Sequence, residues 1–272
     1  VSIRVMGIPS YFSYIIHNHA GVLCKYANIF QKGLQFSRLY MDCNSILYDC
    51  YRQIPNDKPL IEIENLLLES AGKQIEMYIS QINPSETVYI AFDGVAPMAK
   101  MEQQRTRRYK SWFEATITNQ IENKAPLDPQ KTTSMFTPGT SFMNKLSKYM
   151  RTKFEKKEKK YRVEKIIVAT PDEPGEGEHK LFSHMRDHPT DGLCAVYGLD
   201  ADLMMLGLFH LSFCQNIYIF RESPQFATNL LKKTKNETMH KDEPLFVDVA
   251  KLGRSIASEM RCNAPDNHRM YD

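Results

Sequence analysis

Apolar runs typical of buried strands alternate with helical segments along this 272-residue chain, and this alternation constrains the fold more than any other feature. A strand-like run at 38–43 is followed by helical periodicity over 62–82 and by a second strand-like run at 87–92. Strand, helix, strand order favours parallel pairing, because parallel strands need a crossover connection between them. We therefore predict an α/β fold with a mostly parallel central sheet and helices on both faces.

Three more strands and two more helices extend the pattern. Strands are expected at 165–169, 193–197 and 216–220, and helices at 178–186 and 202–210. In open sheets of this kind, ligands bind beyond the carboxyl ends of the strands. Functional side chains should therefore follow the strands directly.

Carboxylates recur at that position. One acid lies at the end of each of the first two predicted strands and a pair follows each of the next two: Asp42, Asp93, Glu176, Glu178, Asp200 and Asp202. Each of them alone is also typical of a turn or a helix cap. Six acids at one edge would repel one another, so a fold tolerates them only when cations neutralise the charge. All-oxygen ligands select Mg²⁺ or Mn²⁺, and two such ions can activate water and stabilise the leaving oxygen of an in-line displacement at phosphorus.

A basic segment follows Asp93 by seven residues. On a helix, its Lys100, Gln104, Arg107 and Arg108 share one face, where arginine forks and a lysine charge can hold a phosphate group. A solvated basic face is the alternative. The short separation from Asp93 favours a phosphate site beside the proposed metals.

Composition excludes several other classes of protein. The chain is 42% hydrophobic and 25% charged, and no apolar run is long enough for a signal peptide or a membrane span, so we expect an intracellular and more specifically cytoplasmic protein. Six cysteines without metal-ligand spacing argue against a zinc site and a disulfide framework. Cys43, Cys194, Trp112 and Phe113 are expected in the core, with base stacking as the alternative for the two aromatic residues. The mixed-charge run at 151–165 is expected to be exposed.

In their order along the chain, these motifs resemble the XRN-type 5′→3′ exoribonucleases, which implies a PIN/5′-nuclease-like fold. The resemblance spans residues 6 to about 222, so we expect a nuclease core at 1–222 and a weakly matching continuation of the same domain at 223–272. The segments that carry it are MGIPSYFSYI (6–15), YMDCNSILYDC (40–50), AFDGVAPMAKMEQQRTRRYKS (91–111), FTPGTSFM (136–143), PGEGEHK (174–180) and YGLDADLMMLGL (197–208).

The resemblance implies a metal-dependent enzyme that degrades single-stranded RNA with a 5′ monophosphate to mononucleotides, as in RNA decay. The six acids would bind two Mg²⁺ or Mn²⁺ ions and catalyse hydrolysis together with Lys100. The substrate's 5′ phosphate would be held by Lys100, Gln104, Arg107 and Arg108. Tyr48 would stack on a base, where the family usually has histidine. Met98 stands where the family often has arginine.

One motif of the family has no counterpart in this sequence. Its last aspartate lies in a GNDF-like segment, and the chain reaches Asp272 without it. We therefore expect a truncated chain, a natural short form, or a chain completed by a C-terminal segment or a partner. Two alternatives stay open: a catalytically silent RNA-binding or scaffold fragment, and a flap-type nuclease acting on DNA. A D-x-D phosphatase ranks last, because DADLM has no hydroxyl residue after the second aspartate.

Overall fold

The computed structural model of the chain describes residues 11–30, 35–55, 57–123, 131–222 and 244–260. In this part, the strands form one sheet in the order β1-β7-β6-β5-β2-β3-β4. The sheet is mostly parallel and helices surround it, which confirms the predicted α/β class and is consistent with a PIN-like nuclease fold.

The chain divides into two compact units. The first unit holds residues 1–41, 82–88 and 181–272, and the second holds residues 42–81 and 89–180. The predicted boundary at residue 222 stays a prediction, because 223–243 and 261–272 lie outside the described residues.

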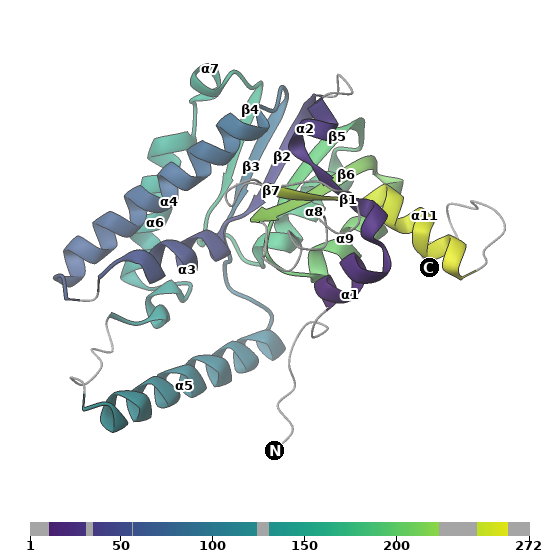
Figure 1. Cartoon of the computed structure of the whole chain (residues 1–272). Coiled ribbons are helices and arrows are strands. Elements are labelled where there is room, and N and C mark those ends of the chain that lie inside the picture. The colour runs from purple at the N-terminus through teal and green to yellow at the C-terminus, as the bar shows by residue number, and fades with distance from the viewer. Residues whose placement is uncertain (1–10, 31–34, 56, 124–130, 223–243, 261–272) are drawn as a thin grey trace. The chain divides into compact units, whose positions relative to one another are not determined.

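The first unit contains most of the sheet. Its strands are β1 (Leu23–Lys25), β2 (Phe36–Asp42), β5 (Thr190–Tyr197), β6 (Cys214–Glu222) and β7 (Pro244–Asp248), and its helices are α1 (Tyr11–Asn18), α2 (Tyr26–Phe30), α9 (Asp202–Phe209) and α11 (Val249–Glu259). Strand β5 pairs in parallel with β2 on one side and with β6 on the other (Figure 1). Strand β7 runs antiparallel to both β6 and β1, a pairing that the sequence patterns did not predict.

The core of the first unit lies around the middle strands. Cys194 is fully buried on β5, as predicted, because side chains of a central parallel strand lie beneath the helices that cover the faces of the sheet. Phe246 on β7 stacks against Phe36 of β2 and Phe220 of β6, with ring centroids 5.9 and 5.3 Å apart. These stacked rings join the parallel and antiparallel parts of the sheet into one apolar layer.

The second unit surrounds the two remaining strands. These are β3 (Thr87–Ala91), whose first two residues are grouped with the first unit, and β4 (Lys165–Ala169). Its helices are α3 (Asn44–Gln53), α4 (Leu60–Ile82), α5 (Met98–Ile121), α6 (Ser141–Phe154) and α7 (Glu158–Tyr161), with a 3-10 turn at Thr133–Phe136. Helix α8 (Gly177–Asp187) begins in the second unit and continues into the first.

Helices α4 and α6 lie side by side in the second unit (Figure 1). The predicted periodicity of α4 is confirmed, since Ile63, Leu67 and Ile75 are fully buried at helical spacing. A Cβ at Gly72 would lie 3.0 Å from the ring of Tyr149, so the small residue permits the close approach of the two helices.

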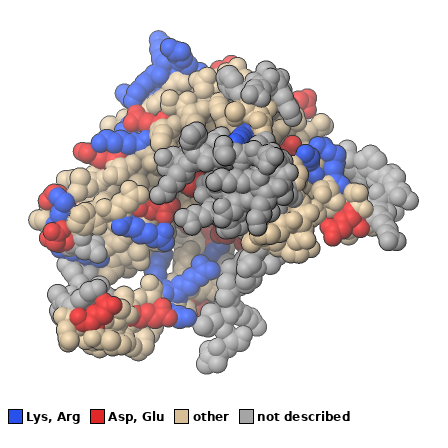
Figure 2. Space-filling model, viewed as in Figure 1, with Lys and Arg blue, Asp and Glu red and all other residues tan. Residues whose placement is uncertain are grey.

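Two predictions about exposed and buried segments need correction. Trp112 and Phe113 are not core residues, because their side chains are 41% and 49% exposed and no residue of α5 is buried. The mixed-charge run at 151–165 is only partly exposed, because Phe154 and Val163 are buried. Lys153 and the exposed Lys160 both ion-pair with Glu76 of α4, at 2.9 and 2.6 Å. Other lysines of the run stay exposed around α7, where Figure 2 shows blue side chains gathered.

No helix within the described ranges is long and apolar enough to cross a membrane.

Candidate metal and phosphate site

Two predicted acids lie where neighbouring strands end in the second unit. Asp42 is the last residue of β2, and Asp93 follows β3 by two residues. The N–H of Cys43 donates to the carbonyl of Ala91 at 2.9 Å, and the Asn44 side-chain oxygen accepts from the N–H of Asp93 at 3.2 Å. The ends of both strands are therefore fixed against each other, with Asn44 between the acids.

Gly177, the first residue of α8, lies between Glu176 and Glu178 and brings this pair of glutamates to the same place. Its N–H donates to Asp93 Oδ1 at 2.7 Å. A Cβ at this position would lie 2.7 Å from Asp42 Oδ1 and 3.4 Å from Asp93 Oδ1. The glycine between the two glutamates therefore allows Asp42, Asp93 and the start of α8 to converge.

Glu176 supplies the most buried carboxylate of this group, with 6% of its surface exposed. Its Oε2 accepts a 2.8 Å hydrogen bond from Lys100 Nζ, whereas its buried Oε1 has no hydrogen-bond partner among the described residues. A buried carboxylate oxygen without a partner is costly, and a cation would remove that cost. The geometry at Glu176 therefore fits a metal ligand.

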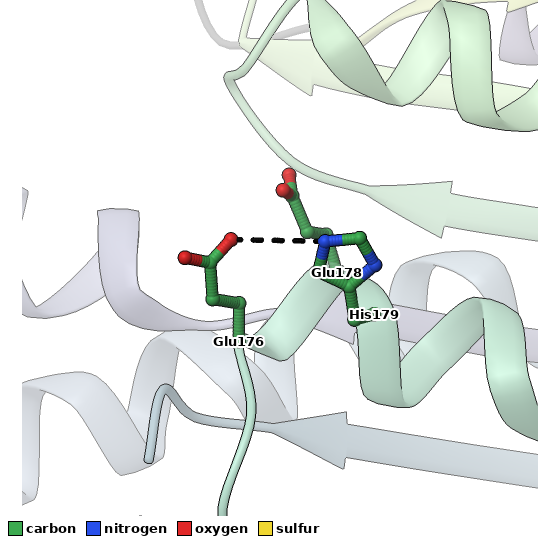
Figure 3. Close-up of side chains that lie close together, drawn as sticks. All are labelled: Glu176, Glu178 and His179. Atoms are coloured by element: carbon green, nitrogen blue, oxygen red, sulfur yellow. Dashed lines mark ion pairs between the residues drawn. The ribbon is translucent and has the colours of Figure 1, made fainter. Parts of the chain in front are cut away.

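Glu176, Glu178 and His179 form a small cluster whose potential ligand atoms lie within 4.8 Å of one another. Figure 3 shows the Glu176 side chain, from the segment before α8, turned toward the imidazole of His179, whose Nε2 lies 3.9 Å from Glu176 Oε2. His179 is absent from the residues predicted to bind metal. The Glu-x-x-His spacing over one helical turn is the sequence signal that identifies it.

The charges in this cluster act on one another. Burial raises the pKa of Asp93. The hydrogen bond from Gly177 works to lower this pKa, and the negative charge of Glu176 raises it further. For Lys100, burial works to lower the pKa, but the ion pair with Glu176 outweighs it and raises the pKa. Excess negative charge at this position favours a bound cation.

The predicted phosphate-binding residues all lie on α5. Helical geometry places Lys100, Gln104, Arg107 and Arg108 on one face of this helix, and Lys100 also contacts Glu176. Arg107 and Arg108 are not members of an ion pair within the described ranges. The basic face thus begins at the acidic cluster and continues along α5.

Tyr48 of α3 lies near both kinds of charge. Burial raises the pKa of its hydroxyl, and the nearby charges of Arg108, Asp93 and Arg107 act on it as well. Its ring packs edge-on against Phe136, with centroids 5.0 Å apart. A role in base stacking stays a prediction.

Asp200 and Asp202 belong to the first unit. Asp200 is exposed beyond the end of β5, and Asp202 is the first residue of α9. That these two acids join the other four stays a prediction.

Comparisons with known proteins place the chain in a family. The sequence profile described as "XRN 5'-3' exonuclease N-terminus" matches residues 6–223. The chain is similar to the 5'-3' exoribonuclease 2 of Schizosaccharomyces pombe, with 33% identity over 231 residues that cover 76% of this chain and 23% of the relative. It is also similar to the 5'-3' exoribonuclease 1 of Saccharomyces cerevisiae, with 36% identity over 219 residues that cover 75% of this chain and 14% of the relative.

The human 5'-3' exoribonuclease 1 is 31% identical over 217 residues, which cover 75% of this chain and 12% of the relative. The chain therefore spans less than a quarter of the length of these three relatives. The matched residues include all of the motifs that form the acidic cluster and the basic face. This chain belongs to the XRN family of 5′→3′ exonucleases.

Proposed function

We propose that this chain is the nuclease region of a metal-dependent 5′→3′ exoribonuclease that degrades 5′-monophosphorylated, single-stranded RNA to mononucleotides in RNA decay. The observation that carries the proposal is the contact between Lys100 and Glu176, because it joins the helix face proposed to bind phosphate to the acids proposed to bind metal. A terminal phosphate held along α5 would thereby place the adjacent phosphodiester beside the carboxylates.

The acids of this chain fit divalent cations, and we propose two Mg²⁺ or Mn²⁺ ions. Support comes from the unpartnered Oε1 of Glu176 and from the convergence of Asp42, Asp93 and Gly177. We propose Asp200 and Asp202 as further ligands, because β5 and β2 pair with Tyr197 opposite Met41, and Asp42 comes next in the chain. When bound, the ions would stabilise the charge on the attacking and leaving oxygens of the displacement at phosphorus. The proposed ligands are Asp42, Asp93, Glu176, Glu178, Asp200 and Asp202.

The chain's own basic residues would select the end of the substrate. Arginine forks at 107 and 108 can each bind two phosphate oxygens, and Gln104 can donate one further hydrogen bond. Lys100 would share its charge between Glu176 and the phosphate and would stabilise negative charge that develops during hydrolysis. Tyr48 would stack on a base next to the phosphate. We propose that a site for a single terminal phosphate would reject a capped end.

The test compares RNA carrying a 5′ monophosphate with the same RNA carrying a 5′ hydroxyl, in the presence of Mg²⁺ or Mn²⁺. We expect the phosphorylated RNA to be degraded at least about 10-fold faster, because the hydroxyl end cannot form charge-assisted hydrogen bonds with Arg108. Arg108→Gln should reduce this preference, whereas Arg105→Gln, on a different face of α5, should leave it unchanged. Equal degradation of both RNAs by the unmodified chain would reject the phosphate site.

A second variant tests the proposed metal ligands outside the second unit. Asp200→Ala should eliminate turnover and leave RNA binding largely intact, because phosphate contacts and metal contacts come from different residues. Turnover and binding are measured separately, by mononucleotide release and by fluorescence anisotropy of labelled RNA. Cleavage that persists in Asp200→Ala would remove this residue from the ligand set.

A further inference from the structure

The segments that carry Asp93 and Glu176 run beside each other after β3 and β4 end. The N–H of Phe92 donates to the Ala169 carbonyl at 2.9 Å. Further along, the N–H of Gly94 donates to the carbonyl of Gly175, and the N–H of Gly175 donates to the carbonyl of Val95, both at 2.9 Å. The two segments are thus hydrogen-bonded before and after Asp93.

Between these bonds lie two backbone carbonyl groups of fully buried residues. They belong to Phe92, which directly precedes Asp93, and to Thr170, which begins the segment leading to Glu176. Lys180 Nζ donates to both, at 2.8 Å to Phe92 and 3.1 Å to Thr170. The Thr170 carbonyl also accepts from the N–H of Glu173 at 3.1 Å, so the ammonium group adds a bond that joins this turn after β4 to the end of β3.

Lys180 also ties these segments to α8. Its own N–H donates to the carbonyl of Glu176 at 3.1 Å, which places it in the first turn of the helix. Its side chain is partly buried, and the charges of Glu173, Asp93 and Asp172 surround its ammonium group. One side chain therefore connects the end of β3, the end of β4 and the start of α8.

The packing leaves little room for independent movement of the two segments. A Cβ at Gly94 would lie 1.7 Å from the carbonyl oxygen of Glu173, so the backbones touch at this point. Gly175 has a positive φ of 99°, a conformation that favours glycine. A shift of Phe92 relative to Thr170 would therefore move Asp93 relative to Glu176.

We propose that Lys180 is a positioning residue that sets the separation of Asp93 and Glu176 by holding the carbonyls of Phe92 and Thr170. The proposal rests on the proposed metal-dependent function of the same site. Lys180 would not touch the substrate or the ions, and it would act through the backbone next to the two ligands. Its loss should therefore reduce metal affinity and kcat more than KM.

The first experiment tests the positioning contact without metal or RNA. Lys180→Met keeps an unbranched side chain, one atom shorter than lysine, and removes its donors. Glycine-selective ¹⁵N labelling allows hydrogen exchange to be followed at Gly94, Gly175 and Gly177, whose amides bond across the two segments. We expect these amides to exchange at least about 10-fold faster in the variant, whereas Gly72 of α4 keeps its rate. Unchanged exchange at the three amides would overturn the proposal.

The second experiment separates positioning from stability. Lys145→Met is the matched control. Lys145 of α6 ion-pairs with the buried Glu64 of α4 at 2.5 Å, away from the strand ends. Both variants should lose stability to urea, but only Lys180→Met should lose Mn²⁺ affinity, by about 10-fold as for other residues that orient ligands. Mn²⁺ binding is measured by electron paramagnetic resonance and unfolding by circular dichroism.

The outcomes distinguish this inference from the proposed function. Normal Mn²⁺ affinity in Lys180→Met, or an equal loss in Lys145→Met, would overturn the positioning role. A chain that binds Mn²⁺ but degrades no RNA would instead contradict the proposed nuclease activity, and the exchange and affinity measurements would still decide the role of Lys180. If RNA is degraded, Lys180→Met should lower kcat with little change in KM. Because kcat is corrected for the fraction of folded protein, a general loss of folded protein cannot produce this result.

Discussion

Lys100 Nζ lies 2.8 Å from Glu176 Oε2 and joins α5 to the segment before α8, although the two residues are 76 positions apart in the chain. The lysine is partly exposed, whereas the glutamate is almost completely buried. The ammonium group of Lys100 is thus held between the buried carboxylate of the acidic cluster and a solvent-facing basic helix. This arrangement makes Lys100 the residue whose substitution should affect both sites.

For Lys100→Met, we expect kcat/KM on 5′-phosphorylated RNA to fall about 100-fold, because a preorganised charge near the reacting phosphate is lost. The loss should be smaller on 5′-hydroxyl RNA, which has no terminal phosphate for the lysine to hold. Lys110→Met is the control, since Lys110 pairs with Glu114 on the same helix at 3.6 Å, outside the predicted phosphate face. Equal losses on both RNAs would show that Lys100 does not contact the terminal phosphate.

His179→Gln tests whether imidazole contributes to metal choice. Imidazole suits transition metals such as Mn²⁺ better than Mg²⁺, so the variant should bind Mn²⁺ about 10-fold more weakly, with a smaller effect on Mg²⁺. Isothermal titration with each ion measures the two affinities. His188→Gln serves as the control, because His188 stacks on His184 with ring centroids 4.2 Å apart and is not part of the cluster. A variant whose Mn²⁺ affinity stays unchanged would exclude His179 as a ligand.

Asp93→Asn should stabilise the metal-free protein while it abolishes activity. Burial raises the pKa of Asp93, so the ionised form is disfavoured in the folded state, and neutral asparagine keeps an oxygen for the N–H of Gly177. We expect a gain of about 1 kcal/mol in the free energy of unfolding, as is common when a functional site is relieved of unfavourable charge. Urea titrations with a chelator present provide the measurement. Asp49→Asn, which removes an exposed partner of Arg52, should change stability by less than about 0.5 kcal/mol. Destabilisation by Asp93→Asn would contradict the charge argument.

Glu76 should make the fold sensitive to acid. Burial works to raise the pKa of its carboxyl group, but hydrogen bonds from Lys160, Lys153 and Tyr161 outweigh it and lower the pKa from 4.5 to about 2. A lowered pKa stabilises the fold above the unfolded-state value, and this stabilisation disappears as the pH falls from 4.5 to about 2. Glu76→Gln should therefore be less stable than the unmodified protein near neutral pH and lose less stability on acidification. Urea unfolding at about pH 7 and about pH 3 compares the two proteins, and parallel losses would contradict the prediction.

The local patterns of the sequence determined the class of fold and the place of the acids. Alternating strand and helix signals predict β3, α4 and β4 to within two residues at each end, because hydrophobic periodicity and turn residues act over short distances. The same patterns place Asp42 at the end of one strand and Asp93 just after another, where the structure has them. The helical spacing of Lys100 and Arg107 likewise needs only the geometry of α5.

Contacts between distant segments were decided by the tertiary structure alone. No local pattern indicates that Glu176 keeps one buried oxygen unpartnered, that Lys180 joins the ends of two strands, or that β7 runs antiparallel to β6. The prediction for Trp112 failed for the same reason, since an aromatic side chain is buried only if another segment covers it. Burial and pairing depend on which residues meet in space, and chain folding brings together residues that periodicity treats as independent.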